Sequence, residues 1–213
     1  MQSGITGDTN ISSSPTQSLV LASSSRYRKM LIERLGLNVE CIAPEIDETP
    51  LVNENGEALA MRLARQKSEV IASTQSNRFV IGSDQVAVVT TNSNTEITLG
   101  KSGTRQKAFE QLSLCQNKTV TFYTSVCLYN PKTTNITSHT DITDVTFRAL
   151  CERQIYQYID IEKPFDCAGS FKCEGLGIRL FTSIDNQDPT ALIGLPLIGL
   201  SQLLLDAGID PLN

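Results

Sequence analysis

The chain has 213 residues, of which 40% are hydrophobic and 19% charged, and its formal net charge is −5. These values predict a globular protein of one large domain or two small ones, and they exclude a chain that is disordered throughout. The acidic balance argues against a broad surface for nucleic acid or membrane, but it leaves room for a local basic pocket that binds a small anion.

Cysteine and histidine usage narrows the chemistry. The chain holds six cysteines, no Cys-x-x-Cys pair and a single histidine, His139. A zinc site is therefore not expected. We predict reduced thiols and a cytoplasmic protein, because a chain of this length without a secretory signal does not need a disulfide framework. A bound metal would need oxygen ligands, which points to Mg²⁺ or Mn²⁺.

The first 17 residues are rich in Ser, Thr, Gln and Asn and show no periodicity. They are predicted to form a disordered leader. They lack the basic start and the apolar stretch of a secretory signal. Residues 18–213 are expected to form a single domain.

The first predicted strand, Leu19–Ala22, runs into three serines and then into a helix over residues 26–35. A serine-rich turn at a helix start presents backbone amides to an anion. Plain capping of the helix is the alternative. Arg26, Arg28 and Lys29 favour the anion, because cations in a first helical turn oppose the helix dipole.

A second predicted strand, over residues 38–43, leads into the loop 44–50, which carries three carboxylates between two prolines. A charge run is usually only a solvated surface. Here the prolines stiffen the loop, which favours carboxylates held in place. The next predicted helix covers residues 57–73 and carries Lys67, which is solvated by default.

The most informative stretch is Phe79-Val-Ile-Gly-Ser-Asp-Gln-Val-Ala. Its first three residues predict a short buried strand, Gly82 a sharp exit, and the following residues a second short strand. Asp84 is thereby expected at a strand end, where open α/β sheets usually carry their chemistry. An ordinary turn in which Asp84 caps backbone amides is the alternative.

The rest of the chain predicts further regular elements. Residues 90–98 are expected to form a hairpin tip, and residues 119–129 and 136–147 an antiparallel pair with His139 exposed. Residues 165–177 are expected to form a loop and 178–181 a strand. The apolar run 191–205 is too short to span a bilayer and contains Pro196. Further helices are predicted at 104–114, at 152–161, and from about 196 to near 208.

Four charged stretches are therefore candidates for one site. They supply cations, carboxylates and backbone amides, which is the mixture that a nucleoside triphosphate bound with Mg²⁺ requires. No Walker loop is present, so the chain is not a P-loop NTPase. The stretches are Ser23–Arg28, Glu45–Glu48, Gly82–Gln85 together with Lys101, and Ser170–Glu174.

The same stretches carry a family resemblance that covers Leu19 to Leu212. In chain order they make the sequence similar to the Maf family of nucleoside triphosphate pyrophosphatases. The matching pieces are Leu-Ala-Ser-Ser-Ser at 21–25 with Arg28, Pro-Glu-Ile-Asp-Glu-Thr at 44–49, Arg-Leu-Ala-Arg-Gln-Lys at 62–67, Gly-Ser-Asp-Gln-Val at 82–86, Gly-Lys at 100–101, Cys-Ala-Gly-Ser-Phe-Lys at 167–172, Glu-Gly-Leu-Gly at 174–177 and Leu-Ile-Gly-Leu-Pro-Leu at 192–197.

The resemblance implies a fold and an activity. The fold would be α/β, a mixed and twisted sheet with flanking helices in two lobes around a central cleft, as in Maf and ITPase-like proteins. The resemblance also allows a homodimer. The activity would be hydrolysis of a nucleoside triphosphate to the monophosphate and diphosphate, with Asp84 as the proton acceptor for the attacking water.

The residues agree with this chemistry. A carboxylate such as Asp84 can accept a proton from water. Glu45 of the acidic loop is the predicted metal ligand, with Asp84 sharing the ion. Cations neutralise phosphate charge that grows in the transition state, and a serine hydroxyl can donate to a phosphate oxygen. The predicted phosphate-binding residues are Ser23, Arg28, Lys67 and Lys101.

Three positions, Tyr27, Gln85 and Glu174, are similar to the branch of the family that hydrolyses 7-methyl-GTP. The methylated ring is cationic, so an aromatic face such as Tyr27 attracts it. Glu174 can accept two hydrogen bonds from the guanine N–H groups, and Gln85 offers both a donor and an acceptor. The alternative is that Tyr27 packs in the core and Glu174 is a solvated loop carboxylate.

Two other functions stay open. One is the branch of the family that takes dTTP and UTP, whose members usually have arginine, threonine and glutamine at the three positions. The other is a non-catalytic inhibitor of septation or division that acts through a partner. A binding module would not need Asp84, Glu45 and both lysines together. We expect a nucleotide substrate, and neither a nucleic-acid nor a membrane partner.

Overall fold

A computed structural model of the chain describes residues 18–91, 93 and 95–212. The predicted leader over residues 1–17 lies outside this range. One mixed sheet of seven strands forms the centre, and helices flank it, which confirms the predicted fold class. Within the described residues, no helix is long and apolar enough to cross a membrane.

The strands run in the order β2-β1-β3-β5-β6-β7, and β4 pairs with β3. β1 is parallel to both of its neighbours, whereas all other pairs are antiparallel. The long β5–β6 pair confirms the predicted antiparallel hairpin. The strands are β1 Leu19–Ala22, β2 Val39–Cys41, β3 Phe79–Thr90, β4 Glu96–Leu99, β5 Thr119–Asn130, β6 Asn135–Phe147 and β7 Phe181–Asp185.

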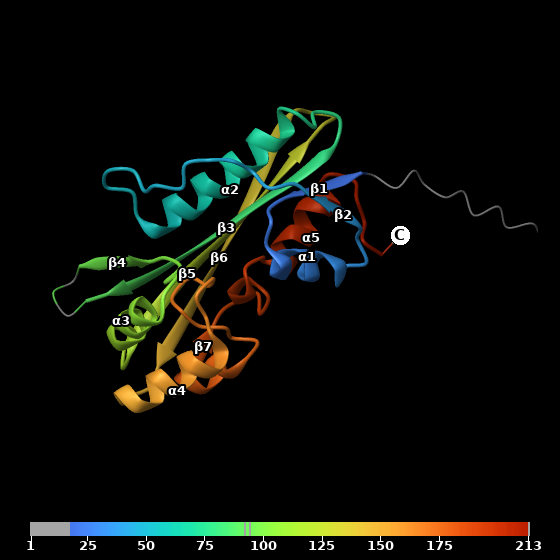
Figure 1. Cartoon of the computed structure of the whole chain (residues 1–213). Coiled ribbons are helices and arrows are strands. Elements are labelled where there is room, and N and C mark those ends of the chain that lie inside the picture. Colours follow the sequence, from blue (N-terminus) through green and yellow to red (C-terminus); the bar gives the residue numbers. More distant parts are fainter. Residues whose placement is uncertain (1–17, 92, 94, 213) are drawn as a thin grey trace, which may run out of the picture.

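Helices cover the sheet in separate groups (Figure 1). α1 and α5 lie with β1 and β2 at one end, α3 and α4 lie with β7 at the other, and α2 runs alongside the long strand β3. Apolar side chains of each end group form their own buried cluster. The division into two lobes of a single domain stays a prediction. The helices are α1 Arg26–Glu33, α2 Gly56–Ala72, α3 Arg105–Cys115, α4 Glu152–Glu162 and α5 Leu197–Asp206, with short 3₁₀ turns η1 Leu176–Leu180 and η2 Ala191–Ile193.

The central strand differs from its prediction. β3 is continuous over twelve residues and does not break at Gly82. The reason is the β5 ladder, which pairs with β3 without interruption from Val80 to Val89. Asp84 therefore lies in the middle of a strand rather than at its end.

The other edge of β3 is shared between two short strands. β1 pairs with Phe79–Gly82, and β4 pairs with Ala87–Thr90. Residues 83–86 lie between these two segments, and within the described part of the chain they have no strand partner on that edge. Asp84 thus lies just beyond the end of its neighbour β1, although not at the end of its own strand as predicted.

A 3₁₀ turn replaces the strand predicted at 178–181. η1 buries Gly177 and Leu180, three residues apart, on one face, as the period of a 3₁₀ helix requires. The Gly177 amide donates to the Lys172 carbonyl at 3.0 Å. The strand begins only at Phe181, whose ring packs edge-on against Phe147.

Gly82 has a packing role. A Cβ atom at this position would lie 2.2 Å from the Ala64 carbonyl oxygen and 2.6 Å from the Ser68 amide nitrogen. Both atoms belong to the backbone of α2, so neither can rotate away. Glycine at this position therefore permits the close approach of α2 to β3.

We expect Gly82→Ala to lower the free energy of unfolding by about 3 kcal/mol, the upper part of the usual cost of overpacking. Urea unfolding measures the change. Gly100→Ala is the matched control, because a Cβ there meets nothing within 4 Å. Equal stability of the two variants would contradict the packing role of Gly82.

Candidate functional site

A cleft of about 850 Å³ opens beside the unpaired segment of β3. Its walls come from the β1–α1 turn, the acidic loop after β2, α2, and the loops that contain residues 98–101, 166–174 and 192–194. Every predicted site residue except Glu45 lines it. Those residues are Ser23, Tyr27, Arg28, Lys67, Asp84, Gln85, Lys101 and Glu174.

The centre of the cleft is one ammonium between two carboxylates. The Lys67 Nζ lies 2.5 Å from Asp84 Oδ1 and 2.7 Å from Glu48 Oε1. Lys67 is 6% exposed and Asp84 7%. The expectation that Lys67 is solvated is therefore wrong. A charge this deeply buried needs a charged partner. Lys67 therefore holds the Asp84 carboxylate in a fixed orientation.

Glu48 is the acidic-loop residue that reaches the site. Burial tends to raise the pKa of its carboxyl group, but the hydrogen bond from Lys67 and the charges of Lys67, Lys101 and Arg28 outweigh burial and lower the pKa below its ordinary value. Glu45 is exposed and is absent from the cleft walls. Its role as a metal ligand stays a prediction that its position does not support.

The β1–α1 turn prepares hydrogen-bond donors for an anion. Ser23 Oγ accepts from the Ser25 amide at 3.1 Å and from Arg28 Nη1 at 3.4 Å. Within the described part of the chain the Ser23 hydroxyl donates to nothing, so its proton is available to a ligand. Arg28 Nε donates to the Gly194 carbonyl at 2.9 Å, which fixes the guanidinium.

Arg28 also interacts electrostatically with the central carboxylates, Asp84 and Glu48. Burial lowers the pKa of Arg28, while the charges of Asp84 and Glu48 raise it. Arginine stays protonated despite such a shift. Arg28, Lys67 and Lys101 therefore give the cleft a cationic side that suits phosphate oxygens.

Alternate residues of β3 face opposite ways. Asp84 faces Lys67 on α2, whereas Ser83 and Gln85 contact the turn at residues 191–194. Ser83 Oγ donates to the Gly194 carbonyl at 3.3 Å. Gln85 Nε2 donates to the Ala191 and Leu192 carbonyls at 2.9 and 3.2 Å. Gln85 therefore offers a ligand no free donor, contrary to the expectation that it would supply both a donor and an acceptor.

The two remaining specificity candidates lie at the cleft wall. Tyr27 is half-buried, and the Arg26 guanidinium lies 4.8 Å from its ring centroid. Tyr27 is thus not a core residue, and its ring already attracts a cation. Glu174 is exposed and accepts only a weak hydrogen bond from Cys173 Sγ at 3.5 Å. Its carboxylate can accept hydrogen bonds from a ligand.

Sequence reasoning missed two groups in the site. Glu48 was one of three carboxylates in a loop, and no local pattern told them apart. The backbone carbonyls of residues 191–194 carry no sequence signal, because their side chains are apolar and predict only burial.

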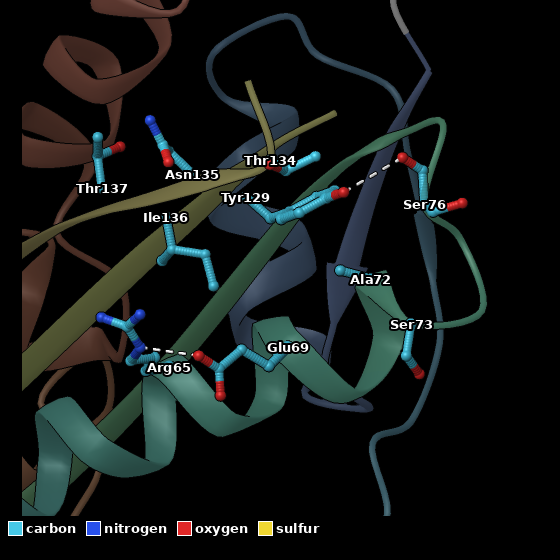
Figure 2. A pocket seen from close by; sticks show the side chains of 10 residues that line it. All are labelled: Arg65, Glu69, Ala72, Ser73, Ser76, Tyr129, Thr134, Asn135, Ile136 and Thr137. Carbon is cyan, nitrogen blue, oxygen red and sulfur yellow. Dashed lines mark hydrogen bonds and ion pairs between the residues drawn. The ribbon is translucent and has the colours of Figure 1, made fainter. Parts of the chain in front are cut away.

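A second hollow, of about 670 Å³, lies between α2 and the β5–β6 hairpin (Figure 2). Its charged groups, Arg65 and Glu69, pair with each other at 2.8 Å. Tyr129 donates its hydroxyl to the Ser76 carbonyl at 3.4 Å. These groups satisfy one another, so the hollow has no candidate chemistry comparable with the cleft.

Comparisons with known proteins found a matching family model and several similar proteins. A family model described as "Maf-like protein" matches residues 18–207. Proteins named 7-methyl-GTP pyrophosphatase are similar along nearly the whole chain. That of Saccharophagus degradans is 47% identical over 91% of this chain and 96% of its own length. That of Nitrosococcus oceani is 47% identical over 93% and 98%, respectively.

Two solved structures are more distant. They are the Ham1 protein of Staphylococcus aureus and a HAM1 protein from Coxiella burnetii. Both are 14% identical to this chain and cover 90% and 89% of it, with TM-scores of 0.48 and 0.45. At these values the likeness carries no inference about function.

The buried ion pair predicts a stability effect. Lys67→Met should lower the free energy of unfolding by about 3 kcal/mol, because Asp84 then stays buried without its cation. Adding Asp84→Asn should restore most of the loss, since the unpaired charge is gone. Urea unfolding of both variants measures the effect.

Lys29→Met is the matched control. Lys29 pairs with Glu33 at 3.7 Å on an exposed helix face, and such pairs contribute about 0.5 kcal/mol or less. If Lys67→Met costs no more than Lys29→Met, the central ion pair does not hold Asp84 in place.

Proposed function

Because the chain belongs to the Maf family, we propose that it is a nucleotide pyrophosphatase that hydrolyses 7-methyl-GTP to 7-methyl-GMP and diphosphate. Such a reaction would remove modified nucleotides from the pool. The observation that carries the proposal is the Asp84 carboxylate, oriented by Lys67 in a cleft with a cationic side. The curated relatives support the choice of substrate by their names and their identity over more than nine-tenths of the chain.

Asp84 is the proton acceptor in this proposal. A water molecule attacks the α-phosphorus, Asp84 takes its proton, and the bond from the α-phosphorus to the oxygen that bridges to the β-phosphate breaks. Diphosphate leaves with that oxygen. A carboxylate held by a neighbouring ammonium suits this role, because its orientation is fixed before substrate binds.

The cations of the cleft bind the triphosphate. Arg28 and Lys101 neutralise phosphate charge, and the Ser23 hydroxyl donates to a phosphate oxygen. Lys67 can shift part of its interaction from the carboxylates to the substrate, since an ammonium has three donors. These interactions strengthen as charge accumulates on the leaving diphosphate.

A divalent cation fits the donor set. Asp84 and Glu48 converge on a single cationic group, and Mg²⁺ is typically held by one or two carboxylates together with substrate phosphates. Among the described residues, no group of three or more His, Cys, Asp or Glu side chains could hold a metal without substrate. When bound, Mg²⁺ or Mn²⁺ would supply further neutralisation of phosphate charge.

Tyr27, Gln85 and Glu174 recognise the base in this proposal. Tyr27 attracts a cationic ring, as its contact with Arg26 illustrates. Glu174 accepts hydrogen bonds from guanine and offsets the charge of the methylated ring. A cytoplasmic location and a homodimer are proposed from the family alone.

A nucleotide panel tests the substrate. We expect the purified protein to release diphosphate from 7-methyl-GTP at least about tenfold faster than from GTP, dTTP or UTP, measured as kcat/KM. The difference matches roughly 1.4 kcal/mol, within the range of one desolvated cation–π contact. Glu174→Gln should reduce this preference more than it reduces total activity.

Asp84→Asn is the negative control for the panel. It should lower turnover on the order of a hundredfold or more, the usual cost of losing a general base. A preference for dTTP or UTP over 7-methyl-GTP would refute the substrate assignment, and near-normal turnover by Asp84→Asn would refute the mechanism.

Activity should also depend on a divalent cation. We expect a chelator to abolish diphosphate release and Mg²⁺ to restore it. Glu48→Gln should raise the Mg²⁺ concentration for half-maximal activity by about tenfold. Loss of a residue that only hydrogen-bonds to a metal ligand already costs about that much in metal affinity. Glu45→Gln is the matched control and should change it less than about twofold. Equal effects of the two variants would show that Glu48 has no special role.

A further inference from the structure

The side-chain amide of Gln85 is held from three directions. Its nitrogen donates to Thr124 Oγ1 at 3.0 Å and to the Ala191 and Leu192 carbonyls at 2.9 and 3.2 Å. Thr124 lies opposite Gln85 on β5 and is fully buried. The two carbonyls belong to the short turn η2.

The chemistry of these partners fixes which way the amide faces. A backbone carbonyl can only accept, so the NH₂ group of Gln85 must face the turn. The Thr124 hydroxyl donates to the Ala191 carbonyl at 3.1 Å, which commits its proton and leaves a lone pair toward Gln85. Within the described residues nothing donates to Gln85 Oε1, so this oxygen is free to accept from a ligand.

We propose that Thr124 is a positioning residue that locks Gln85 as a pure hydrogen-bond acceptor. Gln85 Oε1 then accepts a hydrogen bond from the exocyclic amino group of a guanine base. The inference rests on the proposed function for the identity of the ligand. Thr124 itself does not line the cleft, so it acts only through Gln85.

Guanine suits a wall that presents acceptors. Its edge carries three N–H bonds, one on N1 and two on N2, and methylation at N7 leaves them in place. The two carboxylate oxygens of Glu174 and the Oε1 of Gln85 offer three acceptors. Uracil and thymine present one N–H between two carbonyl oxygens. If Gln85 Oε1 faced either carbonyl, it would have no donor, and binding free energy would be lost.

Binding of two matched probes tests the inference. They are the α,β-methylene analogue of 7-methyl-GTP, which cannot be cleaved between the α- and β-phosphates, and its hypoxanthine counterpart, which lacks only the N2 amino group. We expect the wild-type protein to bind the guanine probe about tenfold more tightly, as calorimetry can measure, since one hydrogen bond to a fixed acceptor is at stake.

Thr124→Val keeps the shape of the side chain but removes the hydroxyl. It should reduce the preference to about threefold or less, because the Gln85 nitrogen keeps its two carbonyl partners but loses the third contact, which fixes the position of Oε1. Thr124→Ser retains the hydroxyl and should restore it. Thr121→Val is the matched control on the same strand, where the hydroxyl donates to Asp144 outside the cleft, and should leave the preference unchanged.

The preference is a ratio of two dissociation constants for one protein sample, so a partly unfolded variant does not distort it. If Thr124→Val does not fold, Thr124→Ala replaces it with the same expectation. A preference that survives loss of the hydroxyl, or a wild-type protein that binds both probes equally, would overturn the inference. Absence of diphosphate release from 7-methyl-GTP would instead refute the proposed function, because binding of these probes requires no hydrolysis.

Discussion

The unequal pairing of β3 is the constraint on which the site depends. One edge is paired without interruption by β5, so the strand stays extended across Asp84. The other edge is divided between β1 and β4, and in the gap between them Asp84, Gln85 and Val86 line the cleft. A strand held on one side and free on the other presents alternate side chains to two walls. Asp84 faces the charges on α2, and Gln85 faces the turn at 191–194.

The cost of burying charge explains the composition of the first wall. Lys67 is almost fully enclosed, and a charge buried to this degree is costly unless it is paired. Asp84 and Glu48 remove that penalty, and Arg28 and Lys101 keep the surroundings cationic. The site is thereby assembled before a ligand arrives. A polyanion that enters finds donors already oriented, so little binding energy is lost in arranging them.

The sequence correctly predicted those helices and strands whose local residue pattern matches the contacts that they make in the fold. β1 occurs at its predicted residues, and α1 begins at Arg26 as expected, because both have clear periodicity or capping signals. All the predicted site residues except Glu45 also line the cleft. The errors concern positions that distant contacts decide. Gly82 looks like a break, yet it accommodates the backbone of α2, and only the folded loop distinguishes Glu48 from Glu45.

The turn at 191–194 connects the two recognition tasks. The Ala191 carbonyl accepts from Gln85, the proposed base contact, and the Gly194 carbonyl accepts from Arg28, the proposed phosphate contact. A buried carboxylate supports the turn: Asp188 accepts from the Thr190 amide at 2.9 Å and from the Ile198 amide at the start of α5 at 2.6 Å. Negative charge at a helix N-terminus is favourable, so α5 and the turn are fixed together. In the proposed function, base and phosphate contacts would therefore share one support, which would tie substrate choice to the placement of the reacting phosphate.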